Sequence, residues 1–250
     1  MVSTRRSRLL LLFLVVLPFG RESLAQSDSL GASGQKRSTD ETARVSGRVF
    51  VAGHYQNPKP LPVFKNRSFC GARIPNESQL IGRDGGLRNA VVALHSLDRS
   101  VVVRPMQLVL DNKRCAFAPH IQVAVVSSEL LLKNSDPILH TVHARLGQEI
   151  LFNVGLPTWR QVTKRLDRPG IVKIDCDVLH TWMSAAIVIT DTPYFAVSDQ
   201  NGNFLIDELP AGRYRAETWH EKLGTKTIGV ALDGNKRFSL DVVYAVNEKY

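Results

Sequence analysis

Short apolar or alternating runs, separated by turn residues, recur along most of the chain. Alternation places every second side chain on one face, as in a strand that packs one face against a core. Asn-Gly, Asp-Gly and Pro-Gly pairs between the runs are typical of turns, and no long segment has a helical apolar period. The pattern predicts an all-β protein built from sandwiches. Strands are expected in VSGRVFV (45–51), NAVVALHS (89–96), QLVLD (107–111), IQVAVV (121–126), ELLLKN (129–134), GIVKIDC (170–176), AAIVIT (185–190), NFLIDEL (203–209), YRAETW (214–219) and RFSLDVV (237–243).

The N-terminal pattern is different. Three arginines precede the apolar run LLLLFLVVLPF (9–19), and small residues follow at positions 23 and 25 of Ser-Leu-Ala (23–25). This is typical of a cleaved secretory signal peptide, expected at residues 1–25, so the protein is predicted to be periplasmic or secreted. The apolar run is short for a bilayer span, and we expect no stable membrane anchor after cleavage. Residues 26–43 lack periodic apolar positions and are expected to form a disordered linker.

Charge and motifs exclude several classes of function. The net charge of +9 would fall to +6 on loss of four arginines and one glutamate with the signal peptide. The basic residues are scattered, without the clustered basic and aromatic pattern of nucleic-acid binding, so no nucleic-acid partner is expected. His220 and Glu221 are consecutive in a strand and point to opposite faces. With no catalytic arrangement or phosphate-binding glycine loop in the sequence, the chain is not expected to be an enzyme.

The chain has three cysteines, Cys70, Cys115 and Cys176. Export implies an oxidising compartment in which thiols pair, and an odd number leaves one over. Cys176 lies close to a histidine and a methionine, so the economical interpretation is a Cys70–Cys115 disulfide with Cys176 kept as a thiolate. Three free, buried cysteines remain the alternative.

The segment CDVLHTWM (176–183) carries the candidate chemistry. Strands are predicted on both sides of it, so the loop can fold His180 and Met183 back toward the sulfur of Cys176. A further ligand must come from elsewhere, and NSDPILHTVHA (134–144) supplies two histidines.

Strand geometry separates those two histidines. In an extended segment His140 and His143 face opposite ways, so only one can share a site with Cys176. His140, at the junction of turn and strand, is the expected ligand. Whether His120 or His143 joins a second metal site stays open.

A thiolate, two imidazoles and a weak thioether form the ligand set of a blue-copper centre. Sulfur donors suit Cu(I) and imidazoles support Cu(II), as electron transfer requires, whereas zinc more often recruits cysteine, histidine or carboxylate ligands. Each of these residues alone is more often part of a core. Together, in a strand-loop-strand setting, they predict one type 1-like copper bound by His140, Cys176, His180 and Met183.

FAPHIQVAVVSSELLLKNSDPILHTV (117–142), followed by the Cys-x3-His-x2-Met loop, resembles the cupredoxin family, including plastocyanin and amicyanin. The resemblance covers residues 103–191 and implies a Greek-key sandwich that exchanges electrons with a redox partner protein. It also implies that one ring edge of His180 reaches the surface as the electron port. Thr141 stands where the family often has an asparagine that ties the two ligand loops together. The ligands that the resemblance implies are His140, the thiolate Cys176, His180 and the axial Met183.

A second resemblance concerns the C-terminal part of the chain. Residues 194–224 resemble a carboxypeptidase regulatory-like, or transthyretin-like, β-sandwich, and the opening strands of that module match VSGRVFV and NAVVALHS. These strands precede the cupredoxin segment. We therefore expect the cupredoxin domain (103–191) to be inserted into a second sandwich made of residues 44–102 and 192–250. Two sandwiches in tandem are the alternative.

These observations predict an exported mononuclear copper protein that acts in electron transfer. A metal-free surface scaffold, with carbohydrate as a possible ligand of the second sandwich, is the first alternative. The second is a copper storage or delivery protein.

Overall fold

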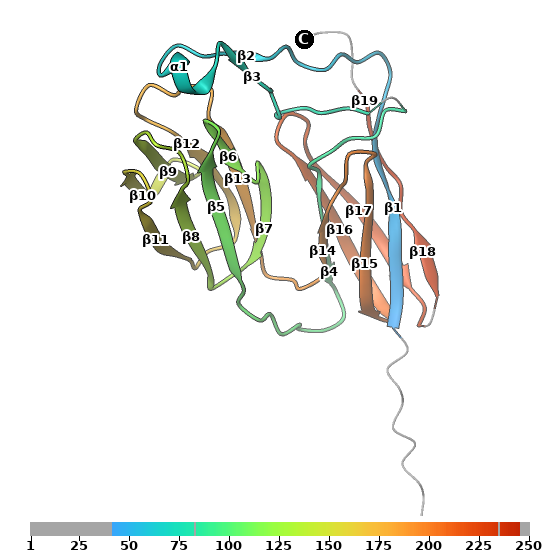
Figure 1. Ribbon diagram of the computed structural model, residues 1–250. Coiled ribbons are helices and arrows are strands. Elements are labelled where there is room, and N and C mark those ends of the chain that lie inside the picture. The colour runs from blue at the N-terminus through green and yellow to red at the C-terminus, as the bar shows by residue number, and fades with distance from the viewer. Residues whose placement is uncertain (1–41, 83, 235, 246–250) are drawn as a thin grey trace, which may run out of the picture. The chain divides into compact units, whose positions relative to one another are not determined.

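The computed structural model describes residues 42–82, 84–234 and 236–245 (Figure 1). Strands make up nearly all of its regular structure, which confirms the all-β prediction. The expected signal peptide and almost all of the expected linker lie outside the described residues. Within the described part of the chain, no helix is long and apolar enough to cross a membrane.

The middle of the chain forms two sheets, which we call the inner sandwich. One sheet has the order β10-β9-β12-β13-β7, and the other has the order β11-β8-β5-β6. The strands are β5 (Gln107–Lys113), β6 (Ala116–Ala118), β7 (Ile121–Val125), β8 (Ser128–Asn134), β9 (His140–Leu146), β10 (Glu149–Leu156), β11 (Gln161–Leu166), β12 (Gly170–Asp175) and β13 (Ser184–Thr190).

The inner sandwich is held by the alternation that its sequence predicts. In β8, Leu130 and Leu132 are fully buried while Leu131 between them is only partly buried. They pack in one core cluster with Val142 of β9 and Ile174 of β12, which belong to the other sheet. Burial of apolar side chains from both sheets, at about 25 cal/mol per Å² of apolar area, stabilises the sandwich.

Strands from both ends of the described chain form the outer sandwich. Its sheets have the orders β15-β1-β18, with β19 also on β1, and β14-β4-β16-β17. The blue β1 therefore lies among orange and red strands in Figure 1. The strands are β1 (Thr42–Ala52), β4 (Val91–Ser96), β14 (Phe195–Val197), β15 (Asn203–Pro210), β16 (Gly212–His220), β17 (Gly224–Leu232), β18 (Arg237–Ser239) and β19 (Val242–Ala245).

The chain passes from β4 into the inner sandwich and returns to β14 at one place. Strand β4, which precedes the inner sandwich, pairs with β14, which follows it. The backbone N–H of Leu94 donates to the carbonyl of Tyr194 at 2.8 Å, and the Thr192 hydroxyl donates to the Leu94 carbonyl at 2.7 Å. The segments that lead into and out of the inner sandwich are thus joined by hydrogen bonds.

A short segment between β1 and β4 packs on the inner sandwich. It contains β2 (Leu61–Pro62), α1 (Arg67–Cys70) and β3 (Arg73–Ile74), and we call residues 61–74 the cap. Its Val63 and Ile74 are buried in the inner core. Its Cys70 forms a disulfide with Cys115, which lies in the two-residue turn between β5 and β6.

Candidate metal centre

The loop 176–183 is fixed at both ends by a strand pair. Strands β12 and β13 are antiparallel, and Asp175 pairs with Ser184 across the mouth of the loop. Inside the loop, the Met183 N–H donates to the His180 carbonyl at 2.9 Å. Leu179 has a φ of 65°, a left-handed conformation that is uncommon for a leucine, and its side chain is exposed. The next residue, His180, turns inward and is buried.

His140 begins β9 directly after a turn. His140, Val142 and Ala144 are buried, while Thr141 and His143 are partly exposed. This alternation confirms that the two histidines face opposite ways, as period two requires. His140 enters the interior of the inner sandwich.

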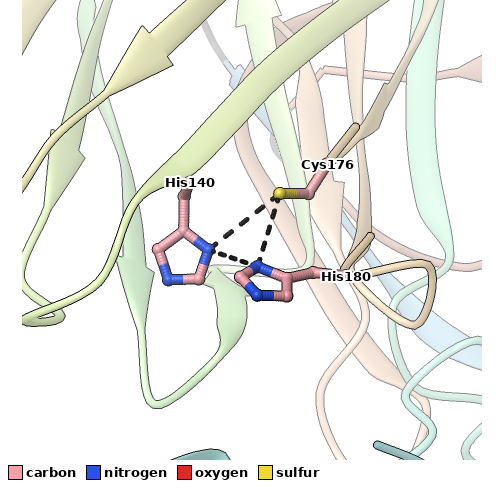
Figure 2. A group of neighbouring side chains, drawn as sticks. All are labelled: His140, Cys176 and His180. Atoms are coloured by element: carbon pink, nitrogen blue, oxygen red, sulfur yellow. Dashed lines mark hydrogen bonds between the residues drawn. The ribbon is translucent and has the colours of Figure 1, made fainter. Parts of the chain in front are cut away.

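Three side chains converge at this end of the inner sandwich (Figure 2). The Sγ of Cys176 lies 4.0 Å from Nδ1 of His140 and 3.7 Å from Nδ1 of His180. The two Nδ1 atoms are 3.1 Å apart. His140 is 0%, His180 1% and Cys176 4% exposed, so the group is shielded from bulk water.

The Nε2 atoms of both histidine rings form hydrogen bonds with side-chain oxygens. Nε2 of His140 lies 3.0 Å from a carboxylate oxygen of Asp136, and Nε2 of His180 lies 2.9 Å from the amide oxygen of Asn66. Because these oxygens accept hydrogen bonds, each Nε2 carries the proton and each Nδ1 is left with its lone pair. Asp136 is itself fixed by the backbone N–H groups of Arg114 and Cys115.

Both imidazoles are neutral at pH 7. Burial lowers the pKa of His140, and the hydrogen bond to Asp136 opposes this only in part. Burial lowers the pKa of His180 to about 4, and repulsion from a protonated His140 and from the Lys65 ammonium acts in the same direction. Neutral imidazole is the form that binds a metal ion.

The sulfur of Cys176 receives hydrogen bonds from Thr141. The Thr141 backbone N–H lies 3.4 Å and its hydroxyl 3.7 Å from Sγ. The same hydroxyl oxygen accepts the N–H of Asp177 at 2.7 Å, which leaves its proton free to point at the sulfur. Thr141 thus ties β9 to the ligand loop.

The donor set fits a metal ion. Two unprotonated nitrogens 3.1 Å apart repel each other unless a proton or a cation lies between them, and the lowering of both histidine pKa values by burial opposes a proton. An ion about 2.0 Å from nitrogen and about 2.3 Å from sulfur, at tetrahedral to trigonal angles, separates its donors by about 3.3–3.7 Å. The S–N separation to His180, 3.7 Å, lies at the upper end of that range, while the N–N separation of 3.1 Å is slightly shorter and the S–N separation to His140, 4.0 Å, slightly longer. One thiolate with two imidazoles is a set that suits copper.

Met183 is the fourth residue of the predicted ligand set, and its position is compatible with that role. It is 2% exposed and lines the same pocket as Cys176. Together with His140, Cys176 and His180 it gives a type 1-like arrangement, with the thioether supplied by the turn that holds His180.

Two other histidines lie outside the group. His143 contacts the carboxylate of Asp177, with its Nδ1 3.0 Å from one oxygen. His120 uses both ring nitrogens elsewhere, on the Ser184 carbonyl at 2.9 Å and on Glu221 of the outer sandwich at 2.5 Å. Among the described residues, the group that could bind a metal consists of His140, Cys176 and His180.

One expectation about the site is wrong. The ring of His180 does not reach the surface, because Asn66 of the cap covers its Nε2 edge. Sequence reasoning missed both Asn66 and Asp136. Asp136 stands in a turn four residues before His140, a spacing that could have indicated it, whereas Asn66 is 114 residues from His180.

No family model matches this chain, and no curated protein matches it. Among solved structures it is similar to a purple cupredoxin from Nitrosopumilus maritimus, at 18% identity over 34% of this chain and 98% of that one, with a TM-score of 0.30. A reduced amicyanin variant shares 17% identity over 33% of this chain and 81% of its own, with a TM-score of 0.30.

A copper-containing nitrite reductase from Thermus scotoductus shares 17% identity over 38% of this chain, with a TM-score of 0.32. This chain spans only 26% of that reductase chain. These three likenesses leave the outer sandwich unidentified.

Proposed function

We propose that the protein binds one copper ion through His140, Cys176, His180 and Met183 and acts in electron transfer. The observation that carries the proposal is the convergence of two unprotonated Nδ1 atoms and one cysteine sulfur in a buried site. Copper, when bound, supplies a one-electron couple between its +1 and +2 states.

The chain's own contribution is a rigid, dry set of donors. Asp136 and Asn66 hold the rings in the required tautomer, and Thr141 orients the sulfur. Since these supports belong to strands, a turn and the cap, the donors keep their places in both oxidation states. A buried site of this kind favours retention of the metal over delivery to a chelator or partner.

The proposal also covers the location of the protein, its partner and its domain arrangement. We propose export through a cleaved signal peptide at residues 1–25, a periplasmic or secreted location, and a redox protein as partner. We further propose that residues 103–191 form a cupredoxin domain inserted into a regulatory-like sandwich. The pairing of β1 with β15 and of β4 with β16 supports this arrangement over two sandwiches in tandem.

Copper titration with visible spectroscopy tests the proposal. Purified protein given Cu(II) should bind one equivalent and develop intense absorption from sulfur-to-copper charge transfer. Cys176→Ser should abolish the colour, because the hydroxyl cannot supply the thiolate electrons. His140→Ala should weaken binding or open the site to water. A colourless wild-type protein without affinity for copper would instead support the metal-free scaffold.

The thioether has a smaller expected effect. Met183→Leu should leave copper bound and raise the reduction potential, because loss of a weak axial sulfur donor favours Cu(I). Potentiometric titration of the two proteins gives the comparison. An unchanged or lowered potential would remove Met183 from the ligand set while leaving the other three ligands in place.

A further inference from the structure

The cap touches the ligand loop at two points. The Lys65 ammonium lies 3.4 Å from the Val178 carbonyl, and the Asn66 amide oxygen accepts the Nε2 proton of His180 at 2.9 Å. In both contacts the cap residue belongs to no strand of the inner sandwich. The cap connects β1 to β4, and both of these strands belong to the outer sandwich (Figure 1). A segment outside the metal-bearing sheets therefore supplies a direct contact to a proposed ligand.

Asn66 has the conformation that this contact needs. Its backbone is left-handed, with φ 56° and ψ 33°, and its carbonyl accepts the N–H groups of Phe69 and Cys70 at 3.0 and 2.9 Å. Asparagine tolerates this region better than most residues. The backbone alone starts the helical turn, and the side chain makes no helix-capping hydrogen bond. The amide is thus free to bind His180.

The disulfide connects Asn66, which binds His180, to the residues that hold Asp136, which binds His140. Cys70, at the end of α1, is bonded to Cys115. The Cys115 N–H donates to Asp136 at 2.8 Å, and Asp136 accepts the Nε2 proton of His140. The Cys115 carbonyl also accepts the indole N–H of Trp182 at 3.0 Å.

Trp182 contacts the second histidine ring. Its ring centroid lies 5.1 Å from that of His180. A closed chain of contacts therefore runs from His180 through Asn66, the disulfide and Trp182 back to His180.

We propose that the cap is part of the metal centre, with Asn66 as the positioning residue for His180. This rests on the copper site proposed above. Asn66 fixes the proton on Nε2, keeps the Nδ1 lone pair directed at Cys176 and His140, and closes the ring edge to solvent. The disulfide holds Asn66 at that distance. A hydrogen-bond partner on the remote nitrogen of a ligand histidine typically changes metal affinity by 10- to 100-fold.

Three variants separate the amide from the backbone. Asn66→Gly removes the acceptor and keeps access to the left-handed conformation. Asn66→Asp retains an acceptor oxygen and tolerates the same backbone. Asn89→Gly is the matched control, because Asn89 has a similar φ of 64° next to β4 and is not part of the site.

The first measurement uses metal-free protein, with nitrogen-15 NMR of the His180 ring at pH 7. The wild type, Asn66→Asp and Asn89→Gly should show the Nε2–H tautomer with slow proton exchange. Asn66→Gly should show mixed tautomers and faster exchange. The second measurement is the rate of copper release to a chelator, which should rise 10- to 100-fold in Asn66→Gly only.

Wild-type behaviour of Asn66→Gly in both measurements would overturn the inference. A weakened Asn66→Asp that behaves like Asn66→Gly would also overturn it, since the acceptor oxygen would then not matter. Failure of the proposed function is a different result, namely wild-type protein that takes up no copper. In that case the tautomer of the metal-free protein still decides whether Asn66 positions His180.

Discussion

Each sandwich buries a histidine with a strongly lowered pKa, yet the two regions use it differently. In the outer sandwich, His220 is 1% exposed and burial lowers its pKa to about 4. Its Nδ1 accepts the backbone N–H of Lys222 at 3.3 Å. In the inner sandwich, the chain binds the Nε2 atoms of His140 and His180 and leaves both Nδ1 atoms directed at each other.

This comparison shows which property distinguishes a histidine that can bind a metal ion from a histidine that is merely buried. Burial and a low pKa are common to both regions and follow from removal of an ionisable ring from water. The two regions differ in what the unprotonated nitrogen faces. In the outer sandwich it faces a backbone N–H donor, and in the inner sandwich it faces the lone pair of another nitrogen. Only the second arrangement gains from a cation.

The largest expected effect is on unfolding in the presence of copper. A ligand that binds only the folded state at a thousand times its dissociation constant adds about 4 kcal/mol to the free energy of unfolding. We expect this gain in the wild type and in His220→Gln, but not in His140→Gln or Cys176→Ser. Calorimetry with and without copper measures the difference within each protein. A gain that disappears in His220→Gln would break the comparison.

The next effect is the pH dependence of metal-free protein. The pKa of His220 is about 4 in the folded state and about 6.5 when the ring is exposed. Between these values the unfolded chain binds a proton that the folded chain does not, so the free energy of unfolding falls as pH drops from 6.5 to 4. The loss from His220 is up to about 3 kcal/mol.

Urea unfolding between pH 4 and pH 8 measures this effect. His220→Gln should show a shallower fall than the wild type, by the part that His220 contributes. The rest should persist, because the pKa of His180 is also lowered to about 4. Identical slopes for the two proteins would mean that His220 is protonated without cost.

The smallest expected effect is at His143. It lies on the opposite face of β9 from His140 and contacts the half-exposed carboxylate of Asp177. A partly exposed pair of this kind contributes about 1 kcal/mol or less. His143→Ala should therefore change copper affinity by less than about fivefold in a chelator competition. A tenfold loss would place His143 within the site and refute the alternation.

Much of the fold follows from alternation in the sequence, and the strands that were missed are either very short or lie at sheet edges. The short strands β2, β3, β6 and β14 were not expected. Nor were β10, β11 and β17, each of which lies at the edge of its sheet. Most side chains of β11 and β17 are exposed or only partly buried, so few apolar residues mark them. An edge strand has one neighbour to pack against, so the sequences of β11 and β17 carry a weak signal. This reason does not extend to β10, whose sequence EILFNVGL is rich in apolar residues.

The candidate site could also be predicted only in part from the sequence. Cys176, His180 and Met183 are close in sequence, and period two was enough to choose His140. The burial of His180 could not be predicted, because it depends on Asn66, which the tertiary fold brings from a segment before β4. Local patterns determine which way a side chain faces, but not which distant segment covers it.

The hydrogen bonds that join Leu94 to Tyr194 and Thr192 have a consequence for how the protein is made. During synthesis, β1 and β4 emerge first and have no partners until β14 to β19 follow. The inner sandwich is complete earlier and can fold first. Once folded, it holds its two ends together, so closing this long loop costs little further chain entropy. The outer sandwich is then the last part to form, and until it forms the open edges of β1 and β4 are the region most exposed to aggregation.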